Sequence, residues 1–175
     1  VPDREAVGIR HLRKHGRPPR EPCPDSSEKD VRQPLARPRR RLELAANALG
    51  VCDDAVEMSM NFARAHKRGG KYLIEQQLVQ LNINEMHMLT EALRSFVFRV
   101  AWQHDQKTHS ANAGFVMNYA TDVIQRVTRL NMEVHGAEGC MMNARAEKLV
   151  RDAMVWTHLA GDTVQRIKIL KRIMK

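Results

Sequence analysis

Residues 72–105 carry the clearest structural signal in the chain, YLIEQQLVQLNINEMHMLTEALRSFVFRVAWQHD. Apolar side chains recur in this stretch at intervals of three or four residues, which is the period of one face of an α-helix. The inward stripe consists of Val79, Ile83, Met86, Leu89, Leu93, Val97 and Val100. The spacing predicts a long amphipathic helix from about Tyr72 to about Asp105, separated from the preceding chain by Gly69-Gly70.

The same period recurs on both sides of this segment. Before it, the stripe is Leu42, Ala45, Leu49, Cys52, Val56, Met60 and Ala63. After it, Ser110 is a suitable N-cap for a third helix that ends at Gly136, with an inward stripe of Val116, Ala120, Val123, Val127, Leu130 and Val134. A fourth helix, with Ala146, Leu149, Ala153 and Trp156 inward, is expected to stop near Gly161. A last helix offers Val164, Ile167, Leu170 and Met174.

The pattern contains almost no signal for β-structure. No segment alternates polar and apolar residues for long enough to predict a strand. Long helices joined by short connections are typical of an antiparallel bundle. We therefore expect an all-α fold, an antiparallel four-helix-type bundle, over residues 41–175.

The first forty residues differ from the rest in composition. Residues 1–41 hold twelve of the 29 Lys and Arg residues and six of the 20 Asp and Glu residues, so about two thirds of the net charge of +9 lies there. All seven prolines lie within the first 38 residues. Such a segment buries too little apolar surface to offset its ordering entropy. We expect residues 1–40 to be a basic, proline-rich leader that is disordered.

Composition argues against several classes of function. The basic leader could neutralise phosphates, but no aromatic side chain is interleaved to stack on bases, which argues against a nucleic-acid partner. No Glu is followed three residues later by His, so the signature of a di-iron bundle is missing. His104, Asp105 and His109 have no further ligand at a metal-like spacing, and we predict no metal site.

Targeting and redox signals point to the cytoplasm. The sequence has no apolar run of secretory or membrane-spanning length, and the acidic residues and prolines of the leader do not suit a mitochondrial presequence. The three cysteines, Cys23, Cys52 and Cys140, form no regular spacing. An odd, scattered count suits a reduced compartment better than a disulfide framework. We expect a cytoplasmic protein without a membrane partner.

The last forty residues resemble a known family. Gly136-Ala137-Glu138-Gly139, then EKLVRD at residues 147–152 and GDTVQR at residues 161–166, are similar in order and spacing to the end of the C-terminal helical domain of acyl-CoA dehydrogenases. The resemblance extends over residues 39–175. It implies an FAD-dependent enzyme that oxidises a CH–CH bond beside an acyl-CoA thioester, in which a glutamate removes the α-proton while flavin accepts the β-hydride.

The resemblance also implies which residues would contact the ligands. Residues 63–77 resemble a family segment, A-x-x-R-x-x-F-G-x-x-I/L-x-x-x-Q, that contacts the FAD of the neighbouring subunit. His66 stands in the place of the arginine and Gly69 in the place of the phenylalanine. A second segment, usually Q-x-x-G-G-x-G, meets the adenosine diphosphate half of the flavin. The implied cofactor-binding residues are His66, Arg68, Gln76, Gln77, Glu133, Gly136, Ala137 and Asp162.

The implied catalytic position departs from the family. The glutamate usually precedes Gly161, where this chain has Ala160, and in some members it precedes the arginine that matches Arg41, where this chain has Arg40. Arg41 and Gly161 match substrate-binding positions. No catalytic residue is therefore expected in the chain.

These features lead to a principal interpretation and two alternatives. The first is the C-terminal domain of an acyl-CoA dehydrogenase-like flavoprotein, a truncated product that binds FAD weakly or not at all and is inactive alone. The second is a non-catalytic subunit that completes the flavin site of a partner dehydrogenase. The third is a helical interaction module with a basic tail. The expected partners are a second copy or a larger dehydrogenase subunit, with acyl-CoA as the implied ligand.

Overall fold

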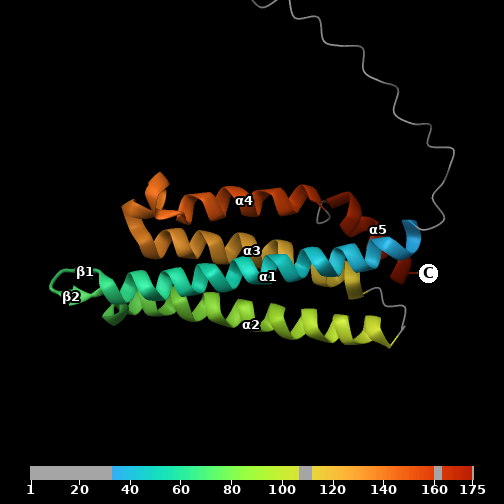
Figure 1. Cartoon of the computed structure of the whole chain (residues 1–175), viewed down its shortest axis with the longest axis horizontal. Coiled ribbons are helices and arrows are strands. Elements are labelled where there is room, and N and C mark those ends of the chain that lie inside the picture. The colour runs from blue at the N-terminus through green and yellow to red at the C-terminus, as the bar shows by residue number, and fades with distance from the viewer. Residues whose placement is uncertain (1–32, 107–111, 160–162, 175) are drawn as a thin grey trace, which may run out of the picture. The chain divides into compact units, whose positions relative to one another are not determined.

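The computed structural model describes residues 33–106, 112–159 and 163–174, and these form a bundle of helices (Figure 1). The chain divides into Val1–Gln33 and a compact unit, Pro34–Lys175. The long helices are α1 (Gln33–Ala65), α2 (Gln77–Asp105), α3 (Asn112–His135) and α4 (Ala146–Leu159), and α5 (Thr163–Ile173) is shorter. Between them lie strands β1 (Lys67–Arg68) and β2 (Lys71–Tyr72) and the 3-10 helices η1 (Leu73–Glu75), η2 (Gly136–Cys140) and η3 (Met142–Ala144).

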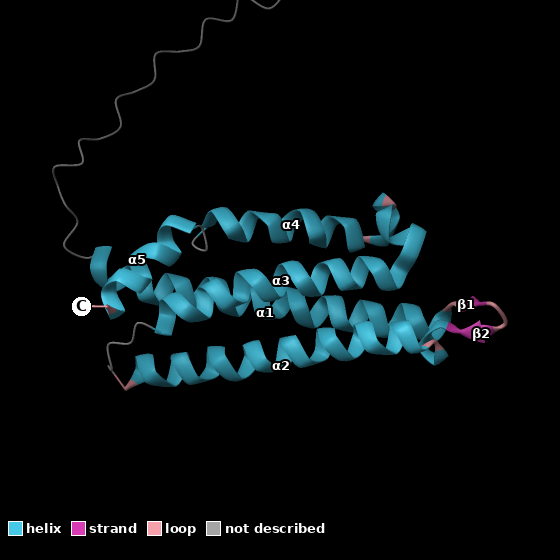
Figure 2. Ribbon diagram, turned by 180° about the vertical axis from the view of Figure 1, so that it is seen from behind, coloured by secondary structure: helices cyan, strands magenta, loops and turns pink. Residues whose placement is uncertain are grey.

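The four long helices run antiparallel to their sequence neighbours. Seen from both sides, α1 ends and α2 begins at the hairpin, while α3 ends and α4 begins at the same end of the bundle (Figure 2). The α5 helix lies at the opposite end. The prediction of an all-α antiparallel bundle is confirmed. None of the helices in the described ranges is long and apolar enough to cross a membrane.

The first helix starts earlier than the composition suggested. It begins at Gln33 and contains Pro38, so it includes the last eight residues of the segment that we assigned to the leader. Proline is tolerated best near a helix N-terminus, because the first N–H groups of a helix have no carbonyl partner within the helix. Pro34 lies in that first turn, whereas Pro38 removes one donor in the second.

The segment between α1 and α2 corrects two predictions. The second helix begins at Gln77 rather than Tyr72, and the residues before it form a small antiparallel hairpin in which Lys67 pairs with Tyr72 and Arg68 with Lys71. Gly69 and Gly70 have φ angles of 62° and 82°, which a two-residue hairpin turn of type I′ requires at both central positions. The glycine pair therefore builds a hairpin, which we had interpreted only as a helix break.

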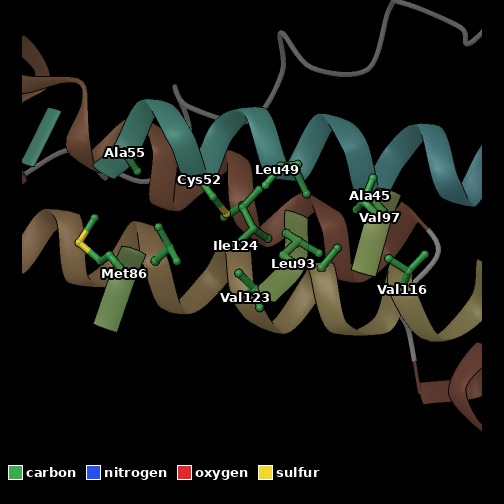
Figure 3. Packing of buried hydrophobic residues seen from close by; sticks show 14 of the residues in the cluster. Ala45, Leu49, Cys52, Ala55, Met86, Leu93, Val97, Val116, Val123 and Ile124 are labelled. Carbon is green, nitrogen blue, oxygen red and sulfur yellow. The ribbon is translucent and has the colours of Figure 1, made fainter. Parts of the chain in front are cut away.

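The core follows the helical stripes closely. Every residue of the predicted α3 stripe is buried, and so is every residue of the α2 stripe except Leu89, which is half-buried. Figure 3 shows α1 packed against α2 and α3 through small side chains, among them Ala45, Cys52 and Ala55. The indole N–H of Trp156 in α4 donates to the Leu44 carbonyl at 3.3 Å. All four long helices thus share one apolar core.

A few polar side chains are buried in this core. The Ser59 hydroxyl of α1 donates to the Asn131 side-chain oxygen of α3 at 2.8 Å, and both residues are fully buried. Three buried threonines donate to the carbonyl four residues earlier in their own helix, namely Thr90, Thr121 and Thr128. These bonds satisfy hydroxyls that would otherwise destabilise the interior.

The last helix is rotated relative to the prediction. Among the side chains of α5 that the structure describes, Ile169 is buried, whereas Ile167, Leu170 and Met174 are exposed. A Cβ atom added at Gly114 would lie only 2.6 Å from Ile169 Cδ1, so Ile169 occupies a notch in α3 that only glycine leaves open. Arg166 also forms a bidentate ion pair with Asp122 of α3, at 2.6 and 3.1 Å. The contact with α3 fixes which face of α5 points inward.

Ion pairs join the long helices at the surface. Arg94 of α2 pairs with Asp53 of α1, and Arg126 of α3 contacts Glu85 of α2 through two hydrogen bonds of 2.6 and 2.9 Å. The hydrogen bond from Arg126 lowers the pKa of the Glu85 carboxyl. Because the pair is largely exposed, its contribution to stability is small, and it is lost as the pH falls through the lowered pKa.

The two described cysteines predict a sharp contrast in reactivity. Cys52 is fully buried, and burial, with a smaller effect of Asp53, raises the pKa of its thiol from 9.0 to about 12. Cys140 is exposed. Thiolate is the reactive form. We therefore expect iodoacetamide at pH 8 to alkylate Cys140 in the folded protein and to alkylate Cys52 only after unfolding in urea, as measured by peptide mass spectrometry.

Equal labelling of the two thiols in the folded protein would contradict this burial.

The raised pKa of the Cys52 thiol also makes the stability of the fold depend on pH. Below pH 9 both the folded and the unfolded chain keep this proton, but above it the unfolded chain loses the proton first. The contribution of Cys52 to stability is therefore lost between pH 9 and about pH 12.

Candidate functional site

Two segments far apart in the sequence meet at the hairpin end of the bundle. The first is the hairpin with its flanks, residues 66–77, and the second is the end of α3 with η2, residues 133–140. The nearest atom to a Cβ built on Gly136 is Arg68 Nη1 at 4.0 Å, and His66 Nε2 lies 3.9 Å from Glu138 Oε2. We call these two segments, residues 66–77 and 133–140, the hairpin-end site.

Stacked rings fix the base of the site. The Phe62 ring lies between those of His66 and His135, with centroid distances of 3.9 and 4.2 Å. Each histidine uses Nδ1–H to donate to the carbonyl four residues before it, His66 to Phe62 at 3.0 Å and His135 to Asn131 at 2.7 Å. The stack therefore joins the end of α1 to the end of α3, and it orients Nε2 of His66 toward Glu138.

Side chains within and just after the hairpin stabilise its backbone. Gln76 donates through Nε2 to the Arg68 carbonyl at 3.2 Å, and the backbone N–H of Tyr72 donates to Glu75 Oε2 at 3.0 Å. Lys67 Nζ lies 4.3 Å from the centroid of the Tyr72 ring. Gln76 thus supports the hairpin backbone in this structure, whereas Gln77 is exposed at the first turn of α2.

Glycine allows the second segment to turn tightly. Gly136 has a φ of 59°, the left-handed conformation that commonly ends a helix, and it stops α3 where the sequence predicted. Gly139 is buried, and a Cβ there would lie 2.5 Å from the Met132 carbonyl oxygen. The η2 backbone is therefore pressed against the last turns of α3, with Ala137 exposed beside Gly136.

The side chains in and next to the site are mixed in charge, with four cations and three carboxylates. The exposed cations are Arg64, Lys67, Arg68 and Lys71, and the carboxylates are Glu75, Glu133 and Glu138. Glu133 is exposed near the end of α3, where its charge acts on Arg126. Exposed guanidinium and ammonium groups around an open glycine backbone can hold a phosphate group.

The other implied residues lie at the far end of the bundle or outside the described ranges. Arg41 is half-buried, and its Nη1 would be 3.5 Å from a Cβ at Gly114, next to Ile169. Arg41 and His66 are separated along α1 by about 37 Å. Arg40 is exposed. Ala160, Gly161 and Asp162 lie outside the described residues.

Five of the implied cofactor-binding residues thus lie together at the hairpin end: His66, Arg68, Gln76, Gly136 and Ala137. Gln77 and Glu133 lie at the edges of this group. Arg41 is separated from it. The sequence did not predict the stacking of Phe62 and His135. The spacing of Phe62 and His66 by four residues could have indicated one contact. Within the described ranges, no group of three or more His, Cys, Asp or Glu residues could hold a metal ion.

Comparison with known sequences identifies relatives of this bundle. The family model described as the acyl-CoA dehydrogenase C-terminal domain matches residues 38–174. A probable acyl-CoA dehydrogenase of Bacillus subtilis is 26% identical over 137 residues, and cyclohexane-1-carbonyl-CoA dehydrogenase of Geobacter metallireducens is 29% identical over 137 residues. A subunit of the caffeyl-CoA reductase-Etf complex of Acetobacterium woodii is 26% identical over 137 residues. Each alignment covers 77% of this chain and 36% of the relative.

Solved structures show the same arrangement of helices. An acyl-CoA dehydrogenase from Geobacillus kaustophilus superposes with a TM-score of 0.74 at 24% identity, covering 79% of this chain and 37% of that one. A prolyl acyl carrier protein oxidase superposes with a TM-score of 0.72 at 28% identity, covering 76% of this chain and 36% of that one. The present chain spans about a third of the length of the curated relatives that it matches.

Proposed function

Since the chain belongs to the acyl-CoA dehydrogenase family, we propose that its bundle supplies the C-terminal part of an FAD site. The family model of the C-terminal domain matches residues 38–174. In this proposal the hairpin-end site contacts the adenosine diphosphate half of the flavin. The observation that supports it best is the meeting of Arg68 with Gly136, because these residues belong to the two separate segments that resemble flavin-contacting segments.

The residues present fit a pyrophosphate group. A Cβ at Gly136 would find no heavy atom closer than Arg68 Nη1, so the backbone there is open to close approach by a ligand. Arg68 supplies positive charge there, and Lys71 pairs with Arg68 across the hairpin. Glu133 and Glu138 oppose an anion, but the charge of Glu133 is partly balanced by Arg126 and that of Glu138 by His66 when it is protonated.

The chain provides no proton acceptor at the two positions implied by the family resemblance. Alanine at position 160 has no polar side-chain atom, and the guanidinium of Arg40 offers only N–H donors and no acceptor. FAD, when bound, supplies the hydride acceptor for acyl-CoA oxidation. The α-proton must then be removed by a base from elsewhere, so we propose that the chain alone does not oxidise acyl-CoA.

A second candidate function is that of a non-catalytic subunit. One relative, the caffeyl-CoA reductase-Etf complex subunit, works within a complex of several chains. In this alternative, the hairpin-end site completes the flavin site of a larger dehydrogenase chain, and co-purification with such a flavoprotein would favour it. Binding of an acidic partner that disappears in high salt would instead favour an interaction module with a basic tail.

Titration of the full chain with FAD, followed by nuclear magnetic resonance of its backbone amides, tests the flavin contact. We expect weak binding, with the largest shifts at residues 66–72 and 136–139, and a smaller response to riboflavin because riboflavin lacks the pyrophosphate. Arg68→Glu replaces a cation with an anion and should weaken FAD binding at least about fivefold, the loss of roughly one charge-assisted hydrogen bond.

Lys171→Glu is the matched control, since it makes the same change of charge on α5, at the opposite end of the bundle. This variant should bind FAD as the unmodified chain does. If both variants lose affinity equally, or if the shifts fall outside the hairpin-end site, the proposed contact is wrong.

A further inference from the structure

The α5 helix exposes a row of apolar side chains. Ile167, Leu170 and Met174 are 49%, 54% and 78% exposed. Met174 follows the last residue of α5 and still donates its backbone N–H to the Leu170 carbonyl at 3.2 Å, so it continues the helical turn. Spacings of three and four residues place the three side chains on one side of the helix. The row faces away from α3, because Ile169 and Arg166 hold the other side of α5 against that helix.

Lysine side chains flank this apolar row. Lys168 and Lys171 are exposed, and α5 contains no Asp or Glu. Among the described residues, neither lysine takes part in an ion pair, whereas Arg166 is already paired with Asp122. The charges of the two lysines are therefore available to a partner outside the chain.

The start of α1 adds positive charge at the same end of the bundle. Both views place the first turns of α1 beside α5 (Figures 1 and 2), and Arg41 Nη1 lies 3.5 Å from the Cβ position at Gly114, where Ile169 also packs. Arg40, one residue earlier, is exposed. Two helices thus form a surface that combines apolar side chains with cations. We call this surface the α5 patch, which consists of Arg40, Ile167, Lys168, Leu170, Lys171 and Met174.

A helix side of this kind suits the surface of a lipid bilayer. The apolar side chains can enter the boundary between headgroups and acyl chains, while the flexible lysine stems carry their ammonium groups back to the lipid phosphates. Anionic lipids are favoured, because each Lys or Arg near such a surface adds attraction without a shaped pocket. A peptide helix is commonly bound in a hydrophobic groove, whereas a single exposed helix side matches a flat partner better.

We propose that the α5 patch binds the surface of membranes that contain anionic lipids, with α5 lying in the plane of the interface. This contact is peripheral and needs no helix of spanning length. It departs from the expectation of a protein without a membrane partner, which considered only spanning segments and targeting sequences. It does not depend on the flavin contact, because the hairpin-end site lies at the opposite end of the bundle.

Sedimentation of the full chain with lipid vesicles is the first test. We expect the chain to bind vesicles of phosphatidylcholine with about 30% phosphatidylglycerol, to bind pure phosphatidylcholine much more weakly, and to be released as sodium chloride is added. Failure to bind the anionic vesicles would overturn the proposal. Equal binding to both kinds of vesicle would overturn the role of the lysines.

Single substitutions test whether α5 makes the contact. Lys171→Glu should lower the affinity for anionic vesicles at least about fivefold. Arg129→Glu is the control, since it makes the same change of charge at an exposed position of α3, and its effect should be much smaller. Leu170→Ser should lower the affinity by about tenfold, whereas Leu81→Ser, at a position 65% exposed on α2, should leave it unchanged.

Circular dichroism checks that each variant keeps its helices, which substitutions of exposed residues should preserve. Equal losses from Lys171→Glu and Arg129→Glu would show that binding follows net charge alone. Binding that none of the variants weakens would assign the contact to the basic residues 1–40. Either result would overturn the α5 patch.

A fluorophore sensitive to polarity tests whether α5 enters the interface. In a chain with Cys23 and Cys140 replaced by serine, the label is attached to Leu170→Cys or to Leu81→Cys, while Cys52 is fully buried. Anionic vesicles should shift the emission of the label at position 170 to the blue and leave the label at position 81 unchanged. The opposite pattern would place another face on the membrane and contradict the proposed orientation.

Soluble poly-glutamate distinguishes an acidic protein partner from a lipid surface, because it carries negative charge without an acyl layer. We expect it to bind less tightly than anionic vesicles and without dependence on Leu170. If poly-glutamate binds the full chain and the vesicles do not, the partner is an acidic protein and the assignment to a membrane is wrong.

Discussion

Replacing Leu93 with alanine should lower the free energy of unfolding by about 3 kcal/mol, within the usual range for removal of a fully buried leucine side chain. Leu93 is fully buried and lies among Leu49, Val123 and Ile124, where α1, α2 and α3 meet (Figure 3). The side chains around it belong to three helices that cannot all move inward, so the alanine leaves a cavity. Urea denaturation followed by circular dichroism measures the loss.

Leu170→Ala is the control, because Leu170 is 54% exposed on α5. It should change the stability by less than about 0.5 kcal/mol. Both variants and the parent should be compared at one chain concentration, so that the measured difference reports the substitution alone. A loss of less than 1 kcal/mol at Leu93 would mean that the core is looser than the structure shows.

The second large effect is expected at Gly139. Alanine there would place its Cβ 2.5 Å from the Met132 carbonyl oxygen and 3.0 Å from His135 Cβ. Because the first of these atoms belongs to the helix backbone, η2 must move away from α3. We expect Gly139→Ala to destabilise the protein by about 2 kcal/mol, as overpacking does, and to displace the Gly136 turn from Arg68.

Gly50→Ala provides a control with the opposite sign. Gly50 lies within α1, and a Cβ there would meet nothing within 4 Å. Alanine in a helix interior is more stable than glycine by about 0.5–1 kcal/mol, so this variant should be more stable than the parent. Thermal unfolding compares the two. A Gly139→Ala protein as stable as the parent would show that the close approach of η2 to α3 is incorrect.

The long helices were the predictable part of the fold. The stripes of α2 and α3 are strictly periodic, and burial follows them, because each helix has one face toward a shared core. The hairpin at Lys67–Tyr72 was not predicted, since two adjacent glycines mark a break equally well whether the chain turns as a loop or as a hairpin. Only the pairing across the turn distinguishes the two.

The orientation of α5 shows a different limit. Three residues of its predicted inward stripe, Ile167, Leu170 and Met174, are exposed. Ile169 is buried because Gly114, 55 positions earlier, leaves a notch in α3 that fits it. Such complementarity between distant residues leaves no periodic trace in the helix itself. The same holds for the stack of His66 and His135 on Phe62.

The sequence predicted which residues belong to the candidate site but not how they are arranged in space. Resemblance supplied His66, Arg68, Gln76 and Gly136 as candidates. It did not reveal that Gln76 donates to the Arg68 carbonyl, which makes Gln76 a support of the hairpin in this structure. Nor did it reveal that Arg41 lies at the far end of α1 from the hairpin.

The hydrogen bond between Ser59 and Asn131 has a consequence for the uniqueness of the packing. The inward face of α1 is lined with small residues, Ala45, Ala48, Ala55 and Ala63, so shape alone offers little resistance to sliding α1 along its neighbours. A slide of one turn, about 5.4 Å, would take the Ser59 hydroxyl away from the buried Asn131 amide oxygen and leave that oxygen without its donor. This buried polar pair thus favours one alignment of α1 on α3, as a buried asparagine does in a coiled coil.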